Sequence, residues 1–377
     1  MRIVTDIKTI DDILYLLEHH PYFDNWSQYG HVNTKTEGDY ILFNYSAEAQ
    51  YAGNWNVFER MSRGLIIDKK RLKVMARPFD KFFNWNERGM STDSPIEYVM
   101  EKMDGSLGIC WFDPHFEYAG TTGNWRITTR GSFDSEQAQW ATEFLHANYG
   151  HRLQVMENGF THLFEIIYPE NRIVVDYGKT ADLFLLAVRD NVHGAYINYG
   201  VLIENVAKSI GCKSAKLRQD IVQGGLPILF LAISGIKGVE KEGFVTVHRD
   251  GTRWKFKGED YVRIHKVISS FSFKHTLEAI AAGTFEQWIE SIPDEFLGDI
   301  RQWEHAIRDE FKRIKLQINE KFWKVEPIKT RKLFAEAVID NYPDIAPFLF
   351  RKLDGKLTDE FIYQKHDFSH LEQGESE

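Results

Sequence analysis

The chain of 377 residues contains only two cysteines, Cys110 and Cys212. Two thiols cannot build a disulfide framework or, by themselves, a zinc site, which favours a reducing compartment. No uninterrupted apolar run reaches the roughly 18 residues that cross a membrane. The first twenty residues interleave acidic with apolar side chains, unlike a signal peptide. We therefore expect a cytoplasmic protein with no membrane partner.

Positive charge is also scarce, because 46 Lys and Arg stand against 55 Asp and Glu, a formal net charge of −9. A uniformly basic coat for nucleic acid is excluded, so any polyanion site must be a local cluster of cations. Aromatic residues are plentiful at 14%, and hydrophobic residues make up 43%. This composition can fill a large core and excludes a mainly disordered chain. The length suits two domains.

Short β-rich runs separated by Gly, Asn, Asp and Pro occupy most of the chain from about residue 39 to 258. Their close spacing leaves little room for helical crossovers, so antiparallel sheets are favoured over a doubly wound parallel sheet. Helices are predicted near the N-terminus and at 135–150. The predicted strands are 40–45, 63–68, 73–79, 98–102, 107–112, 116–120, 125–131, 160–169, 172–178, 182–190 and two strands within 242–258.

The hydrophobic period becomes helical beyond about residue 260. Apolar residues at steps of three and four predict one long helix with a buried face. The stripe consists of Phe296, Ile300, Trp303, Ile307, Phe311, Ile314, Ile318 and Phe322. The sequence therefore predicts an α+β protein, with an antiparallel-sheet domain at 1–260 followed by an all-α domain at 261–377.

The sequence Lys102-Met103-Asp104-Gly105 lies where one predicted strand ends and the next begins. Its lysine is either a surface residue before a hairpin turn or a nucleophile. A second copy at 352–355 lies among helical residues, and we interpret it as a helix end with Gly at the C′ position.

Charged residues on other predicted strands distinguish the first copy. Arg63-Gly64 precedes it, and Glu165 and Glu242 follow it. Lys255 and Lys257 are two residues apart, so on a strand they project from the same face as a pair of cations. The alternative for these charges is a set of cross-strand ion pairs.

This ordered set resembles the covalent nucleotidyltransferases, which include polynucleotide ligases and mRNA-capping enzymes. The resemblance covers roughly residues 40–265 and is greatest for phage ATP-dependent RNA ligases of the tRNA-repair type. The further matching segments are Arg77-Pro78, Lys81-Phe82-Phe83-Asn84, Gly131-Ser132, Ser135-Glu136-Gln137-Ala138, Tyr261-Val262 and His265. One departure is Arg130, where that branch usually has lysine.

The resemblance implies a ligase adenylation fold for the first domain and RNA substrate specificity for the helical domain. It implies an ATP-dependent RNA ligase that uses Mg²⁺ or Mn²⁺ and acts as a monomer on single-stranded RNA or a nicked tRNA loop. If a phage encodes the chain, the compartment is the host cytoplasm. In this scheme Lys102 takes AMP from ATP, the AMP moves to a 5′-phosphate, and a 3′-hydroxyl expels it.

The resemblance also assigns roles to individual residues. Lys102 is the nucleophile, and its attack requires the neutral amine, which neighbouring cations favour. Glu286 is implied as a metal ligand. The implied nucleotide-binding residues are Phe43, Arg63, Lys81, Phe83, Arg130, Glu165, Glu242, Lys255 and Lys257.

Two other functions remain open from the sequence. A DNA ligase or a capping enzyme would share the chemistry, but these enzymes usually continue with a small barrel, whereas this chain becomes helical. A nucleotide- or RNA-binding relative without turnover would not need Lys102. Basic residues of the helical region are candidates for phosphate contacts or for solvated helix faces. These are Lys324, Lys329, Arg331, Lys332, Arg351, Lys352 and Lys356.

Overall fold

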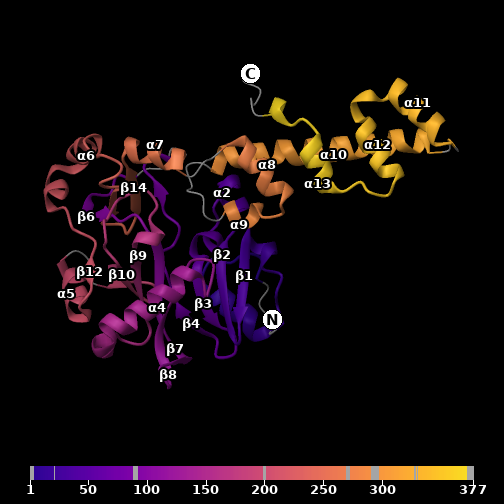
Figure 1. Cartoon of the computed structure of the whole chain (residues 1–377). Coiled ribbons are helices and arrows are strands. Elements are labelled where there is room, and N and C mark those ends of the chain that lie inside the picture. Colours follow the sequence, from indigo (N-terminus) through magenta and orange to yellow (C-terminus); the bar gives the residue numbers. More distant parts are fainter. Residues whose placement is uncertain are drawn as a thin grey trace. The chain divides into compact units, whose positions relative to one another are not determined.

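The computed structural model describes residues 4–20, 22–87, 92–197, 201–268, 272–289, 297–326, 328 and 330–371. Phe296 and Lys329, named above, lie outside these ranges. Contacts between elements divide the chain into two compact units, Met1–Ile268 and Ser269–Glu377 (Figure 1). Among the described helices, none has the length and apolar character needed to cross a membrane.

The first unit begins with helix α1 and a sheet in the order β1-β2-β3-β4, in which neighbouring strands are antiparallel. The apolar face of α1 packs on this sheet, with Ile13 and Leu17 in a cluster that also contains Phe43. The elements are α1 (Ile10–His19), β1 (Val32–Glu37), β2 (Tyr40–Tyr45), α2 (Ala47–Ala52), α3 (Val57–Met61), β3 (Arg63–Asp68) and β4 (Lys73–Ala76).

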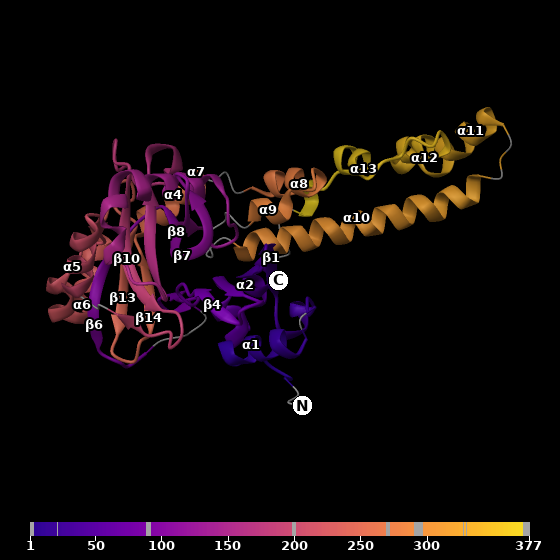
Figure 2. The same ribbon diagram turned by 90° about the horizontal axis from the view of Figure 1, so that it is seen from below.

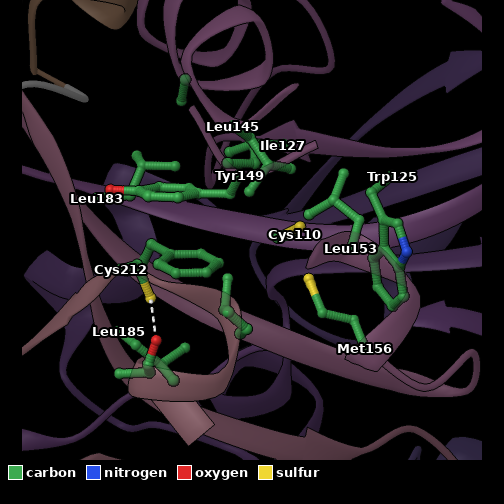
Figure 3. Packing of buried hydrophobic residues seen from close by; sticks show 14 of the residues in the cluster. Cys110, Trp125, Ile127, Leu145, Tyr149, Leu153, Met156, Leu183, Leu185 and Cys212 are labelled. Carbon is green, nitrogen blue, oxygen red and sulfur yellow. Dashed lines mark hydrogen bonds between the residues drawn. The ribbon is translucent and has the colours of Figure 1, made fainter. Parts of the chain in front are cut away.

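A second sheet has the order β11-β10-β9-β7-β8, with β12 added in parallel beside β10. Figure 3 shows the apolar core of this part, in which Cys110 lies near Trp125 and Leu145. Both cysteines are buried free thiols. The elements are β7 (Ser106–Tyr118), β8 (Thr121–Thr128), α4 (Glu136–Tyr149), β9 (Phe160–Ile167), β10 (Asp182–Asp190), β11 (Tyr196–Ile197), α5 (Val201–Ile210) and β12 (Lys213–Ser214).

A third sheet has the order β5-β14-β13-β6 and is antiparallel except for the short pairing of β5 with β14. Helix α6 covers one face, where Ile221 and Leu229 pack against Phe256. The elements are β5 (Phe83–Asn84), β6 (Ile96–Lys102), α6 (Gln219–Ser234), β13 (Gly243–His248), β14 (Arg253–Lys257) and α7 (Glu259–Ile268). The predicted antiparallel sheets are therefore confirmed, and the two parallel pairings were not expected.

The prediction of a strand at 172–178 is wrong. Val174 and Val175 are buried there, but they lie in an irregular segment between β9 and β10. Their backbone N–H groups donate to the carboxylate of Asp104 rather than to a neighbouring strand. The β-branched residues at this position indicate burial and not a strand, because their backbone N–H groups bond to a side chain instead of a neighbouring strand.

Helix α7 belongs to the first unit, although the sequence placed the start of the helical domain at 261. Tyr261 of α7 packs on Val174 and Val175. The second unit instead begins at Ser269. Its described helices are α8 (Phe273–Ala281), α9 (Phe285–Ile289), α10 (Leu297–Val325), α11 (Arg331–Asn341), α12 (Ala346–Leu353) and α13 (Asp359–Lys365).

The long helix α10 confirms the predicted stripe over the described residues. Ile314 and Ile318 are buried against Phe334 of α11 and Phe348 of α12. Figure 2 shows α12 and α13 lying along α10. The second Lys-x-Asp-Gly copy ends α12, and Gly355 has φ +65°, the left-handed conformation that favours glycine at a helix end.

We predict that Ile318→Ala will lower the free energy of unfolding by about 2–5 kcal/mol, because it leaves a cavity in a closely packed core. Ile318 is 0% exposed, whereas Leu316, two residues earlier on α10, is 69% exposed. Urea denaturation should therefore show little change for the control Leu316→Ala. Equal losses in the two variants would contradict the assigned face of α10.

Candidate active site

Asp104 is the anchor of the first Lys-x-Asp-Gly loop, between β6 and β7. Its buried carboxylate accepts hydrogen bonds from the backbone N–H groups of Val174 and Val175 at 2.9 and 2.8 Å. The Tyr261 hydroxyl donates to the other oxygen at 2.7 Å. Asp104 also donates its own N–H to the hydroxyl of Tyr177 at 2.9 Å. A buried carboxylate is tolerated because hydrogen bonds replace its water, so this aspartate fixes the loop.

Gly105 brings the loop against β9. Its N–H donates to Glu165 Oε1 at 3.0 Å. A Cβ at this position would lie 2.5 Å from the carbonyl oxygen of Ile166. Only glycine allows this close approach, so Gly105, the last residue of the motif, lets the loop lie beside Glu165.

Lys102, the last residue of β6, forms an ion pair with Glu242. Lys102 Nζ lies 2.7 Å from Glu242 Oε2, and Lys257 Nζ lies 3.3 Å from Glu242 Oε1. Gly243 pairs with Lys102 on one side and with Lys257 on the other in the sheet register. Three adjacent strands therefore bring together two lysines that share one buried glutamate.

The Glu165 carboxyl is strongly affected by its surroundings. Desolvation is the largest influence and raises the pKa of Glu165 to about 7, against the opposing charge of Lys102. The carboxylates of Glu242 and Asp104 add to this increase in pKa. Because burial disfavours the ionised form of Glu165, a nearby cation would stabilise the carboxylate strongly once its proton is lost.

Lys255 forms a second group, with Phe82 and Arg63. The Phe82 ring centroid lies 5.3 Å from Lys255 Nζ and 5.7 Å from Arg63 Cζ. Both distances are within the range of a cation–π contact. Arg63 Nη1 is buried without a hydrogen-bond partner among the described residues. An anion beside this nitrogen would satisfy it.

Lys81 forms a third group and is almost fully buried among aromatic rings. Its Nζ lies 5.4, 5.0 and 5.6 Å from the ring centroids of Tyr45, Trp55 and Phe83. Arg130 Nη1 donates to the Tyr45 hydroxyl at 2.9 Å. The arginine thus keeps a positive charge at the position where the resemblance expects lysine, and it adds a directed hydrogen bond.

Two aromatic residues do not lie where the nucleotide-binding prediction requires them. Phe43 is 0% exposed and packs between Trp26 and Phe58 in the N-terminal core. Phe83 pairs with Trp254 in the sheet and packs in the core beneath α6. The buried residues of β14 alternate with the lysines, so this core lies on the face opposite Lys255. In this structure both rings are buried in cores, so neither forms an open stacking surface for a nucleotide.

Glu286, which the resemblance implied as a metal ligand, lies among arginines. It lies in α9 of the second unit and forms ion pairs with Arg301 at 3.3 Å and Arg308 at 3.8 Å. Two guanidinium groups repel a metal cation. A metal role for Glu286 is therefore not supported.

The sequence pattern did not single out Phe82, nor the anchoring role of Asp104 with Tyr177. The sequence does not show which of the adjacent rings, Phe82 or Phe83, faces the cations. Strand alternation indicates only that the two rings point to opposite faces. Among the described residues, no cluster of three or more His, Cys, Asp or Glu side chains could hold a metal ion. Glu165, which has no lysine or arginine ion pair in the part of the chain that the structure describes, nevertheless fits a divalent cation that takes its remaining ligands from phosphates and water.

The family described as RNA ligase matches residues 61–279. A presumed RNA ligase of Thermovibrio ammonificans is 29% identical over 168 residues, which cover 43% of this chain and 42% of that protein. An RNA ligase of Rhodothermus phage RM378 is 23% identical over 403 residues, covering 86% of this chain and 87% of the phage protein.

Among solved structures, an RNA ligase of Naegleria gruberi with PPi is 18% identical to this chain. The alignment covers 45% of this chain and 51% of that chain, with a TM-score of 0.35. The chain therefore spans less than half of the length of the T. ammonificans relative and most of the length of the phage relative.

We predict that stability will depend on pH through Glu165. Its pKa is higher in the folded chain than the ordinary value of 4.5, so the folded protein binds this proton more tightly. The resulting stabilisation is present below the unfolded pKa and is lost as the pH rises through about 7. Relative to Glu165→Gln, the wild type should therefore lose free energy of unfolding between about pH 5 and pH 8.

Urea denaturation across this pH range measures the difference. The control Glu170→Gln changes an exposed carboxyl just beyond β9 and should leave most of the wild-type pH dependence in place. A pH-independent difference between wild type and Glu165→Gln would contradict the raised pKa.

Proposed function

The chain belongs to the RNA ligase family, and we propose that it is an ATP-dependent RNA ligase that joins 5′-phosphate and 3′-hydroxyl ends. The observation that supports this most is the position of Lys102, whose Nζ lies 2.7 Å from Glu242 Oε2 and whose loop contacts Glu165 of β9 through the Gly105 N–H. A lysine nucleophile, two carboxylates and a strand of cations are the groups that nucleotidyl transfer to lysine requires.

In the first step, Lys102 Nζ attacks the α-phosphorus of ATP. A P–N bond forms, the bond to pyrophosphate breaks, and the lysine proton must leave. Glu242 Oε2 is within hydrogen-bond reach of that proton. Lys257 holds the other oxygen of Glu242. Lys255 and Arg63 would bind the departing pyrophosphate, and the unpartnered nitrogen of Arg63 supports this role.

In the second step, the 5′-phosphate of the RNA attacks the lysyl-AMP phosphorus and releases Lys102. In the third step, the 3′-hydroxyl attacks the activated 5′-phosphate, a phosphodiester forms and AMP leaves. Each step replaces one bond to phosphorus by another, so the protein has to position its groups and offset negative charge.

The same reaction implies Mg²⁺ or Mn²⁺ as a cofactor. Glu165 would hold the metal together with oxygens of ATP. When bound, the metal offsets charge on the phosphates. The raised pKa of Glu165 fits this role, because a cation would favour the ionised carboxylate that burial disfavours.

We further propose a division of labour between an adenylation domain over residues 1 to about 260 and a helical domain that selects the RNA. The described elements after Ser269 are helices, which is unlike the barrel expected of a DNA ligase or capping enzyme. A single strand or a nicked tRNA loop is the proposed substrate, with a monomer acting in the cytoplasm of the cell or phage host.

The basic residues of the helical unit give only limited support to RNA binding there. Arg331 pairs with Asp354 and Lys324 pairs with Glu320. Lys352 donates to Asn319. These cations are engaged within the unit, so RNA would have to compete with existing partners.

We predict that α-labelled ATP will leave an acid-labile adduct on the protein, and that Lys102→Ala will abolish it. The reason is that the nucleotide is held through the Lys102 nitrogen. Lys352→Ala is the matched control, because Lys352 occupies the same motif position at the end of α12. Gel autoradiography after denaturation measures both variants, and label on Lys352 would refute the assignment.

Two further arms separate the competing functions. Equal labelling by GTP would favour a capping enzyme, and no labelling of the wild type would favour a binding protein without turnover. Lys102→Arg should be as inactive as Lys102→Ala, because arginine keeps its proton and offers no lone pair to phosphorus.

We predict that Phe82→Leu will slow adenylation by about tenfold, since loss of the ring removes contacts to two phosphate-binding cations. Phe83→Leu removes the adjacent ring, which lies in the core beneath α6. It should lower stability while leaving adenylation of the folded protein closer to the wild-type rate. Single-turnover labelling with a parallel denaturation series measures both effects. The reverse order of effects on adenylation would place Phe83 at the nucleotide.

A further inference from the structure

Two ion pairs, rather than one, join the segment of Lys102 to the segment of Glu242. Lys102 Nζ lies 2.7 Å from Glu242 Oε2, and Lys241 Nζ lies 2.6 Å from Glu101 Oε1. Glu101 and Lys102 are the last residues of β6, while Lys241 and Glu242 directly precede β13. Four charges in two consecutive pairs therefore connect the same two stretches of chain.

The two pairs extend in different directions from β6. Successive side chains of a strand point to opposite faces, so Glu101 points away from the face that carries Lys102. The Glu101 and Lys241 side chains are 18% and 28% exposed, so water screens their contact only partly. A half-buried pair of this kind restrains its segments more than a pair on the open surface.

Just before β13, the chain is joined to β6 by side chains, because the backbone pairing with β6 begins only at Gly243. Residues 241 and 242 precede the strand ladder, whose register begins with Gly243 opposite Lys102. On the β14 side, Gly258 N–H donates to the carbonyl of Glu242 at 2.9 Å. On the β6 side, two ion pairs connect Lys241 and Glu242 to the end of the strand.

The sign of the four charges also selects one alignment. If the segment before β13 moved by one residue, Lys241 would approach Lys102 in place of Glu242. Like charges at this separation repel, and Glu101 would lose its partner. The Glu101–Lys241 pair, called the outer pair below, therefore disfavours any alignment in which Glu242 is moved away from Lys102.

We infer that Glu101 and Lys241 are positioning residues, which hold the segment before β13 so that Glu242 reaches the Lys102 amine. The inference rests on the proposed function, because it assigns the pair to the lysine that would carry AMP. Neither residue contacts the reacting atoms, and their effect passes through Glu242. Breaking the pair should lower the rate constant of adenylation and leave the KM for ATP near its wild-type value.

The test is a double-mutant cycle with Glu101→Gln, Lys241→Gln and the double variant. Single-turnover labelling with α-labelled ATP should give a rate constant about tenfold lower in each single variant. If the residues act as a pair, the double variant should be no slower than either single variant. Multiplicative losses in the double variant, or a wild-type rate in both single variants, would overturn the inference.

Lys237→Gln is the control. Lys237 pairs with Glu240 at 3.4 Å on the same loop, but these side chains are 74% and 66% exposed. This variant should adenylate at the wild-type rate. A rise in the KM for ATP with an unchanged rate constant in the Glu101 or Lys241 variants would overturn the inference, because it would make these residues nucleotide contacts.

A second readout does not depend on ligase activity. Acetic anhydride acylates lysine amines, and mass spectrometry of the peptide that contains Lys102 gives its rate of modification. Loss of the outer pair should loosen the Lys102–Glu242 contact and raise this rate in both single variants. If the wild type forms no AMP adduct, the proposed function fails, and this labelling alone decides whether the pair positions Lys102. Unchanged labelling in both variants would overturn the inference.

Discussion

The hydrogen bonds to Asp104 hold together segments that are far apart in the sequence. Val174 and Val175 come from the connection between β9 and β10, and Tyr261 comes from α7. A buried carboxylate is costly unless its oxygens are satisfied, so these donors and the aspartate require one another. Once the loop is fixed, Gly105 can approach β9, and Lys102 is held at the end of β6. The arrangement of the remaining charges follows from this fixed loop.

Several cations lie close together at this site, although the chain as a whole contains more acidic than basic residues. Lys102 and Lys257 share Glu242, whereas Lys255 and Arg63 lie beside the Phe82 ring. The Phe82 ring thus brings these two cations close together. They form part of a local positive cluster within a protein of net charge −9.

Local patterns in the sequence predicted β2, β3 and β10 with correct bounds, because each is an apolar run between turn residues. The same reasoning failed at 172–178, where a distant carboxylate takes the backbone hydrogen bonds. It also chose Phe83 over Phe82, since the sequence does not state which face of a short strand meets the cations. Long-range hydrogen bonds and the facing of single side chains were the parts that local patterns could not supply.

The two copies of Lys-x-Asp-Gly show how little of a site is contained in a motif. In the second copy, Gly355 ends a helix with φ +65°, and Lys352 contacts Asn319 and the Phe322 ring of α10. In the first copy, glycine is required by a close approach to Ile166, and aspartate binds a distant segment. The same residue types thus meet different physical demands. What distinguishes Lys102 is the set of strands that bring Glu242, Lys257 and Glu165 to it, so the chemistry depends on the tertiary structure around the motif.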